Sequence, residues 1–228
     1  MKLAVCVKEV PEASARTRID PGTLRLDRSG TAALNPFDAH ALEEALRIKE
    51  RTGDVDGAVA GSDLVATARA LSKAVEREHA DLVLLGQQGG DSDGAVLWSA
   101  LAELLQRPVV SQAASLELGD GKITAKRQTE YGYDVIEAPL PAVVAVSDAI
   151  NEPRYPSLKG IMGAKKKPFD TLSAADLGLA PDEIGEAGSR TEVHGLSEPP
   201  SRGDSIRIED DGNAAETIVE YLAERKLL

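Results

Sequence analysis

Three largely apolar runs, separated by helix-like segments, constrain the fold more than any other feature of the sequence. They are Leu3–Val7, Ala80–Gly86 and Pro141–Val146. Strands of a parallel sheet are covered on both faces, so they read as continuous hydrophobic runs rather than as alternating ones. Strand and helix signals that alternate along a chain predict an α/β fold with a mainly parallel sheet.

Four helices are expected. The strongest signal starts at Asn35, which can cap a helix, with Pro36 at the first position and Asp38 where a capping box needs an acid. Glu43 and Arg47 are four residues apart and should form an ion pair. The apolar stripe of this helix is Ala41, Leu42, Ala45, Leu46 and Ile48. The other helices are expected from near Ser62, over Ala95–Leu105 and over Ala214–Lys226.

The remaining segments have weaker signals. The chain between Val7 and Leu34 is rich in charge, Gly and Thr, and reads as a loop. Turns at Gly119–Gly121 and Tyr131–Tyr133 predict hairpins. Short strands are expected at Val109–Val110, Ala114–Leu118, Lys122–Tyr131 and Tyr133–Glu137.

Prolines dominate the stretch Asn151–Lys167, NEPRYPSLKGIMGAKKK, which reads as a surface loop. Lys165–Lys167 is either a solvated run or a surface that attracts an acidic partner. Residues 1–168 are expected to form the α/β domain, including a loop at 154–163. Residues 169–228 are expected to form an extended arm that ends in a helix.

Composition excludes several classes of protein. The net charge of −12 disfavours nucleic-acid and anionic-membrane binding, and the single cysteine excludes an internal disulfide. No segment approaches the roughly 20 apolar residues that span a bilayer, and no signal-peptide core is visible. A soluble, cytoplasmic protein is expected.

The glycine-rich loop that follows the second apolar run is the candidate ligand site. Such a loop, between a buried strand and a helix N-terminus, can bind a phosphate, or it can be an ordinary turn. A second helix N-terminus, at Asn35, could contribute to the same site, and Cys6 ends the first strand. The candidate cofactor-binding residues are Cys6, Asn35, Pro36, Phe37, Asp38, Gly86, Gln87, Gln88, Gly89, Gly90, Asp91, Ser92, Asp93 and Gly94.

No catalytic residue is apparent. The three histidines, His40, His79 and His194, lack metal or triad spacing. An ATP-dependent enzyme would need a lysine or serine over the loop, and none is visible. Trp98 and Ser99 are expected to pack.

Several blocks together resemble the electron-transfer flavoprotein beta-subunit family over nearly the whole chain. They are VCVKEVP, NPFDAHALEEALRIKE, DLVLLGQQGGDSDG, LPAVVAVSDAINEPRYPSLKGIMGAKKK, DLGL and YLAERKLL. The resemblance implies a three-layer nucleotide-binding sandwich, similar to adenine-nucleotide hydrolases.

The same resemblance implies cofactors and partners. An alpha subunit would complete a heterodimer and hold most of the redox FAD, while this chain would hold AMP. Electrons would arrive from acyl-CoA or related flavin dehydrogenases and leave to a membrane quinone oxidoreductase. The alternatives are a bifurcating type with a second FAD and a nucleotide-free assembly subunit.

The resemblance also gives the Asn151–Lys167 stretch a role as the loop that docks on the dehydrogenase, with Leu158 as its anchor. The partner-binding residues implied are Arg154, Tyr155, Pro156, Leu158, Ile161 and Met162.

Three positions depart from the family pattern. Leu97 and Trp98 replace small polar residues that meet phosphate, and Gln128 replaces an acid that pairs with an arginine near the flavin. After Gly53, roughly 30 residues that the family has, the size of one βαβ unit, are not found. Either the sequence omits a stretch, or the chain is a reduced variant that lacks one wall of the nucleotide site.

Overall fold

The computed structural model describes residues 1–12, 14, 18–48, 54–56, 61–197, 206–210 and 212–228. The chain forms two compact units, Met1–Val193 and His194–Leu228. The expected gap after Gly53 falls within 49–60, of which only 54–56 is described.

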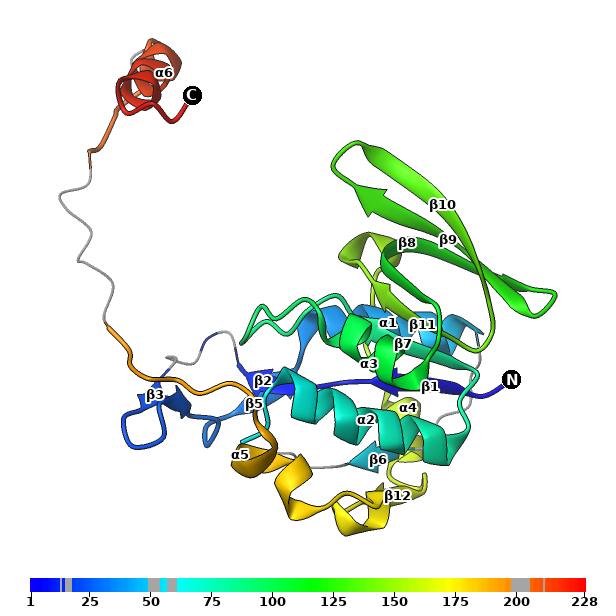
Figure 1. Cartoon of the computed structure of the whole chain (residues 1–228). Helices are drawn as coiled ribbons and strands as arrows, with labels where there is room; N and C mark the ends of the chain where they lie inside the picture. The colour runs from blue at the N-terminus through cyan, green and yellow to red at the C-terminus, as the bar shows by residue number, and fades with distance from the viewer. Residues whose placement is uncertain (13, 15–17, 49–53, 57–60, 198–205, 211) are drawn as a thin grey trace. The chain divides into compact units, whose positions relative to one another are not determined.

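A six-stranded sheet forms the centre of the first unit (Figure 1). Its order is β1-β7-β11-β8-β9-β10, and β1, β7, β11 and β8 are parallel. The predicted parallel α/β sheet is therefore confirmed. The strands are β1 (Leu3–Cys6), β7 (Leu82–Gly86), β11 (Ala142–Val146), β8 (Val109–Gly119), β9 (Lys122–Thr129) and β10 (Gly132–Pro139).

Helices cover both faces of the sheet and make three layers. Helix α1 (Pro36–Ile48) buries Ala41 and Ala45 in one cluster with Leu82, Leu84 and Val144. On the other face, α2 (Leu64–Glu78) and α3 (Leu97–Leu105) pack against alternate residues of the same strands. Strands β7 and β11 are buried throughout, as their continuous apolar runs predict.

Strand β1 lies at the edge of this sheet and is only partly buried. The apolar run Leu3–Val7 predicts a strand that is buried on both faces. An edge strand, however, has a neighbouring strand along only one of its two edges, which leaves it more exposed. The segment before Leu34 is not a plain loop, because it forms two antiparallel pairs. These pairs are β2 (Glu9–Pro11) with β5 (Ala32–Leu34), and β3 (Ile19–Asp20) with β4 (Arg25–Leu26).

Strands β8, β9 and β10 form an antiparallel extension of the sheet. The two strands expected at 109–110 and 114–118 are one strand, because a register shift at Ala113–Ser115 lets β8 leave β11 and continue alongside β9. Tyr133 and Val135 share one face of β10, since strand side chains alternate, and both are more than 60% exposed.

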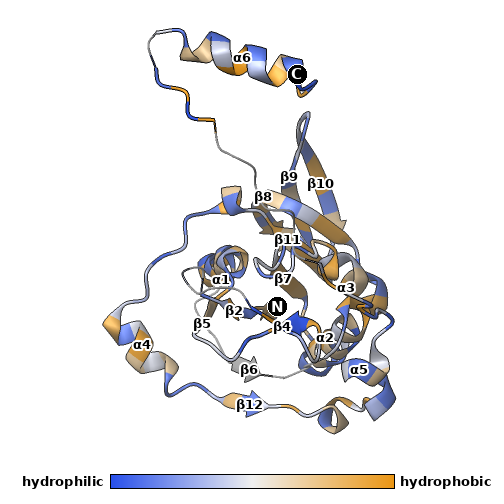
Figure 2. Cartoon of the chain, turned by 90° about the vertical axis from the view of Figure 1, so that its left-hand side faces the viewer, coloured by the Kyte–Doolittle hydropathy of each residue, from blue (hydrophilic) through white to orange (hydrophobic). Residues whose placement is uncertain are grey.

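The segment after β11 is more structured than a loop. A 3-10 turn η1 (Asp148–Ile150) precedes α4 (Leu158–Ala164), and β12 (Phe169–Thr171) pairs with β6 (Asp54–Asp56). The surface loop expected over Asn151–Lys167 therefore contains a helix. Ser157 caps α4 by accepting a hydrogen bond from Gly160 N at 3.1 Å. Figure 2 shows α4 at the periphery of the unit.

Residues 172–193 add short turns to the first unit, beyond the expected boundary at 168. They are η2 (Ala175–Leu177), η3 (Pro181–Glu183) and α5 (Gly185–Gly188). Leu179 is 6% exposed, and Arg69 of α2 donates to the Glu183 carbonyl oxygen at 3.0 Å. These contacts explain why an extended arm does not begin at Phe169.

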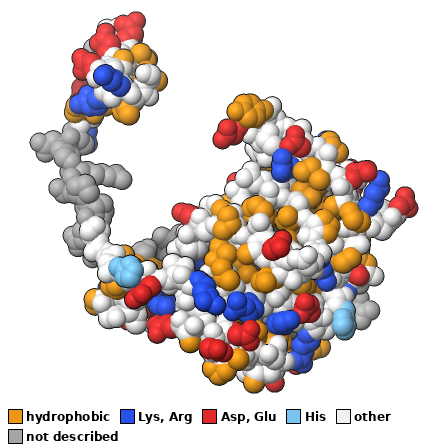
Figure 3. Space-filling model, in the orientation of Figure 1, with side chains coloured by type: hydrophobic (Ala, Val, Ile, Leu, Met, Phe, Trp, Pro, Cys, Tyr) orange, Lys and Arg blue, Asp and Glu red, His pale blue; other side chains and the backbone are white. Residues whose placement is uncertain are grey.

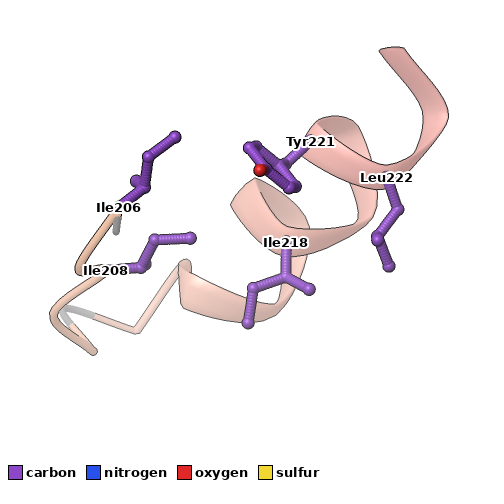
Figure 4. Close-up of a pocket in the computed structure, with 5 residues that line it drawn as sticks. All are labelled: Ile206, Ile208, Ile218, Tyr221 and Leu222. Carbon is purple, nitrogen blue, oxygen red and sulfur yellow. The ribbon is translucent and has the colours of Figure 1, made fainter. Parts of the chain in front are cut away.

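The second unit contains the expected terminal helix, α6 (Ala214–Glu224). Its apolar side chains face Ile206 and Ile208, which precede it, around an open hollow (Figure 4). No α6 residue is buried within the described chain. Among the described residues, no helix combines the length and hydrophobicity needed to cross a bilayer.

Candidate functional site

The end of β7 lies directly against the start of α1. The Gly86 N–H donates to Asp38 Oδ1 at 3.2 Å, and the Lys8 N–H donates to Asp38 Oδ2 at 2.8 Å. A Cβ atom at Gly86 would collide with the Asp38 carboxylate and the Phe37 carbonyl carbon. Glycine is therefore needed here for close approach, and the Asp38 carboxylate joins the segment that follows β1 to the end of β7.

The Asn35 side chain binds the glycine-rich loop. Its Nδ2 donates to the Gln88 carbonyl oxygen at 2.8 Å, and its Oδ1 accepts from Gly90 N at 3.1 Å. Asn35 is buried, so these bonds are shielded from water. The Asn35 turn and the glycine-rich loop, which were proposed to share one site, are thus brought together.

Asp91 in this loop is neutralised by two cations. Lys8 Nζ lies 2.5 Å from Asp91 Oδ1, and Arg28 donates to Asp91 Oδ2 at 2.6 Å. Burial opposes ionisation, but the hydrogen bonds from Lys8 and Arg28 outweigh it and lower the pKa of Asp91. The repulsion that this carboxylate would exert on a phosphate is therefore reduced. Gln88 Nε2 also donates to Asp93, at 3.2 Å.

Burial changes the chemistry of two other site residues. It raises the pKa of the Asp38 carboxyl, against the hydrogen bonds from Asn35, Lys8 and Gly86, which lower it. Burial, together with the charge of Asp38, raises the pKa of the Cys6 thiol to about 12. The Cys6 thiol is therefore protonated at neutral pH, and its side chain packs against the cluster of Val83, Leu85 and Leu101.

Helix α3 follows the loop without a side-chain cap. Val96 at its N-cap makes no side-chain hydrogen bond to the first turn. The Trp98 indole reaches back, and its Nε1 donates to the Gln87 carbonyl oxygen at 3.2 Å. The packing role expected for Trp98 is supported, since it also contacts the cluster of Val83, Leu85 and Leu101.

The docking-loop candidates form a separate group on α4 and the residues before it. Tyr155 is 97% exposed, and Leu158 is 80% exposed. Ile161 and Met162 are also exposed, as are Lys165, Lys166 and Lys167 after the helix. The loop thus presents an apolar surface next to three cations.

Arg154 differs from the rest of this group because its guanidinium binds within the chain. Its Nε donates to Glu43 Oε2 at 2.7 Å, and its terminal nitrogen donates to Glu43 Oε1 at 2.8 Å. Arg47 donates to the same carboxylate at 3.0 Å, as the four-residue spacing predicts. These bonds outweigh burial and lower the pKa of Glu43 to about 2.

Four of these polar residues are not among the candidates from sequence. Lys8 and Arg28 neutralise Asp91, while Glu43 and Glu44 are buried on α1. The sequence did contain a signal for Glu43 and Glu44, which are adjacent acids flanked by the apolar residues of a helix. A carboxylate buried at such a position needs a hydrogen-bonding or charged partner.

The described residues contain no group of three His, Cys, Asp or Glu side chains that could hold a metal ion. His40, the one histidine near these sites, bonds through Nδ1 to the Asn151 carbonyl oxygen at 3.0 Å. On the face seen in Figure 3, positive and negative side chains are mixed.

Comparison with known proteins gives one consistent family. The family model of the electron transfer flavoprotein domain matches residues 56–177. The electron transfer flavoprotein subunit beta of Mycobacterium leprae (strain TN) is 32% identical over 263 residues, covering 99% of each chain. That of Thermoanaerobacterium thermosaccharolyticum is 35% identical over 261 residues, covering 100% of each chain.

A third relative is the caffeyl-CoA reductase-Etf complex subunit CarD of Acetobacterium woodii, 32% identical over 263 residues with 100% of each chain covered. This last alignment, at 263 residues, is longer than the 228-residue chain, so it contains 35 positions that CarD fills and this chain does not.

Proposed function

We propose, from the premise that the chain belongs to the electron transfer flavoprotein beta-subunit family, that it is the docking and scaffold subunit of an electron-carrying heterodimer. The redox flavin, FAD, would be held mainly by an alpha subunit and would supply the electron chemistry. The residues of this chain would support that subunit and bind the dehydrogenase that delivers electrons.

The observation that carries the proposal is the exposed apolar surface on α4. Leu158 and Met162 lie four residues apart on one helix face, and both are largely exposed. An apolar anchor on a projecting segment suits a short-lived redox contact, which buries little area. Its occupant would be an acyl-CoA or related flavin dehydrogenase, with a quinone oxidoreductase as the acceptor.

Two further surfaces suit the alpha subunit. One is the face of the β9–β10 hairpin that exposes Tyr133 and Val135. The other is the apolar side of α6, where Ile218, Tyr221 and Leu222 surround the hollow in Figure 4. The described residues of its own unit cover this apolar stripe only in part, so the helix needs a second surface to bury it.

The glycine-rich loop would hold AMP through main-chain groups. In its favour, the first turn of α3 lacks a side-chain cap and Asp91 is neutralised by Lys8 and Arg28. The side chains of Leu97 and Trp98 add no hydroxyl for phosphate. The affinity would therefore depend on the backbone alone, and a second FAD is disfavoured.

The test is to co-express the chain with its alpha subunit, denature the purified complex and identify the released nucleotides. One FAD and one AMP per heterodimer would support both roles. FAD without AMP would remove the nucleotide role alone, and two FAD would assign the bifurcating type. The docking role is tested by Leu158→Ala, which should raise the KM for an acyl-CoA dehydrogenase at unchanged flavin content.

If Leu158→Ala leaves the KM unchanged, the docking role fails. If no complex with the alpha subunit forms, the scaffold role fails.

A further inference from the structure

The segment just before the exposed α4 helix is attached to α1 by paired polar contacts. Asn151 Nδ2 donates to the His40 carbonyl oxygen and to Glu44 Oε2, each at 3.0 Å. Three residues later, Arg154 binds Glu43 through two of its nitrogens. Both carboxylates come from consecutive residues of α1 that are less than 9% exposed.

The Glu43–Arg154 pair has the geometry of a specific attachment rather than of a loose surface pair. Two parallel N–H···O bonds at 2.7 and 2.8 Å fix the plane of the guanidinium relative to the carboxylate. A lysine keeps the charge but cannot reproduce this fork. The Glu43 carboxylate is 5% exposed, so losing its partner would leave a buried charge poorly satisfied.

The exposed residues begin immediately beyond this attachment. Leu158 follows Arg154 by four residues, a span of at most about 14 Å of extended chain. None of the residues of α4 is buried, so the helix gains little orientation from packing. The position of α4 relative to the sheet therefore depends on the points where the neighbouring chain is attached. The Glu43–Arg154 pair is the attachment on the N-terminal side of α4.

Helix α1 also holds the glycine-rich loop, through Asn35 and Asp38 at its first turn. One helix, packed on the central sheet through Ala41 and Ala45, thus carries the contacts of both candidate sites. Such a rigid element can fix the position of a loop more precisely than another loop can.

We propose that Arg154 is a positioning residue that binds Glu43 to fix the base of the docking loop on α1, so that Leu158 is presented to the dehydrogenase in one orientation. This inference rests on the proposed docking function and extends it. It assigns to Arg154 an intramolecular role in place of a direct contact with the partner.

The test uses the purified heterodimer with Arg154→Lys and Glu43→Gln, and with Arg47→Lys as the matched control. Arg47 binds the same carboxylate from within α1 and holds no part of the loop. Hydrogen–deuterium exchange of the peptide 155–164 should become about tenfold faster in the first two variants and stay unchanged in the control. Exchange of β7 and β11 reports whether the whole fold has loosened.

Kinetics with an acyl-CoA dehydrogenase as the probe supply the second measurement. The KM for the heterodimer should rise about tenfold in Arg154→Lys while kcat changes by less than twofold. Because Glu43 and Arg154 act through one contact, the KM of the double variant should exceed the KM of either single variant by no more than about twofold.

The outcomes separate the attachment from the docking function. Unchanged exchange of the loop in Arg154→Lys and Glu43→Gln would overturn the proposal. If Leu158→Ala raises the KM, the proposal would also be overturned by an Arg154→Lys variant that shows faster loop exchange but an unchanged KM. If Arg154→Lys makes loop exchange faster, but neither Arg154→Lys nor Leu158→Ala changes the KM, docking through this loop would be refuted. The faster exchange would still support Arg154 as the attachment of the loop to α1.

Discussion

Asn35 Nδ2 donates a hydrogen bond to the carbonyl oxygen of Gln88, 53 positions further along the chain, at 2.8 Å. Through its other amide atom the same side chain accepts from Gly90 N. The conformation of the glycine-rich loop is therefore set by α1 as well as by its own glycines.

Replacing Asn35 should destabilise the protein. Asn35→Ala leaves two main-chain groups of the loop without partners, at a cost of about 1–3 kcal/mol in the free energy of unfolding. Asn35→Asp retains an acceptor for Gly90 N, but it places a carboxylate oxygen, instead of a donor, next to the Gln88 carbonyl oxygen. Urea unfolding measures both, and a loss below about 0.5 kcal/mol in Asn35→Ala would contradict the assigned role.

Gly86→Ala should be more damaging than an alanine at an open glycine. The new methyl group would overlap the Asp38 carboxylate and the Phe37 carbonyl carbon, which must move. Overpacking of this kind costs about 1–3 kcal/mol, occasionally more. Gly119→Ala is the control, because no atom lies within 4 Å of its Cβ position. Equal thermal midpoints for the two variants would refute the close approach.

The Glu43 carboxylate makes stability depend on pH in the acid range. Its pKa falls from an ordinary 4.5 to about 2 in the folded chain, because Arg154 binds the ionised form. The folded state therefore holds this proton less tightly than the unfolded state does. The stabilisation is complete above about pH 4.5 and is lost as the pH falls toward 2.

Urea midpoints of the wild type and Glu43→Gln should consequently differ most above pH 4.5 and converge as the pH decreases. Comparing the two proteins removes the contributions of the other carboxyls whose pKa is lowered, such as Asp91 and Glu78. A difference that grows on acidification would reverse the expected sign.

Sequence patterns predicted the parallel strands and the long helices because each depends on local periodicity. The buried runs at β7 and β11 and the helix α2 agree closely with their ranges. The short pairs β2–β5 and β3–β4 were missed, because strands of two or three residues carry too little periodic signal.

The candidate site divides in the same way. The glycine-rich loop and the Asn35 turn were identified locally, but their contact is a long-range property. Sequence reasoning assigned Asn35 and Asp38 to capping α1, whereas tertiary contacts use both side chains. The Glu43–Arg154 pair spans 111 positions, and nothing in the local pattern around either residue specifies it.

The apolar side of α6 should be needed for assembly. Ile218→Asp places a charge in the hollow lined by Ile208 and Leu222, and we expect recovery of the co-expressed alpha subunit to fall at least tenfold. Val219→Asp makes the same change at the next residue, which does not line the hollow, and should retain assembly. Affinity purification through a tag on this chain measures recovery. Equal recovery for both variants would exclude this face as the contact.

Trp98 should limit nucleotide binding at the glycine-rich loop. Its indole donates to the Gln87 carbonyl oxygen across the entrance to α3, and Leu97 beside it offers no polar group. Leu97→Thr combined with Trp98→Gly supplies a hydroxyl and removes the ring. One added hydrogen bond to phosphate is worth about 1.4 kcal/mol, or tenfold in affinity.

Equilibrium dialysis of the heterodimer with labelled AMP should show this increase in the double variant. Trp98→Phe is the control, since it keeps a smaller aromatic ring at this position, loses the Nε1 donor and adds no hydroxyl, and its affinity should stay near that of the wild type. If the double variant binds AMP no more tightly than Trp98→Phe does, these two side chains do not determine the affinity, and the main-chain groups of the loop alone set it.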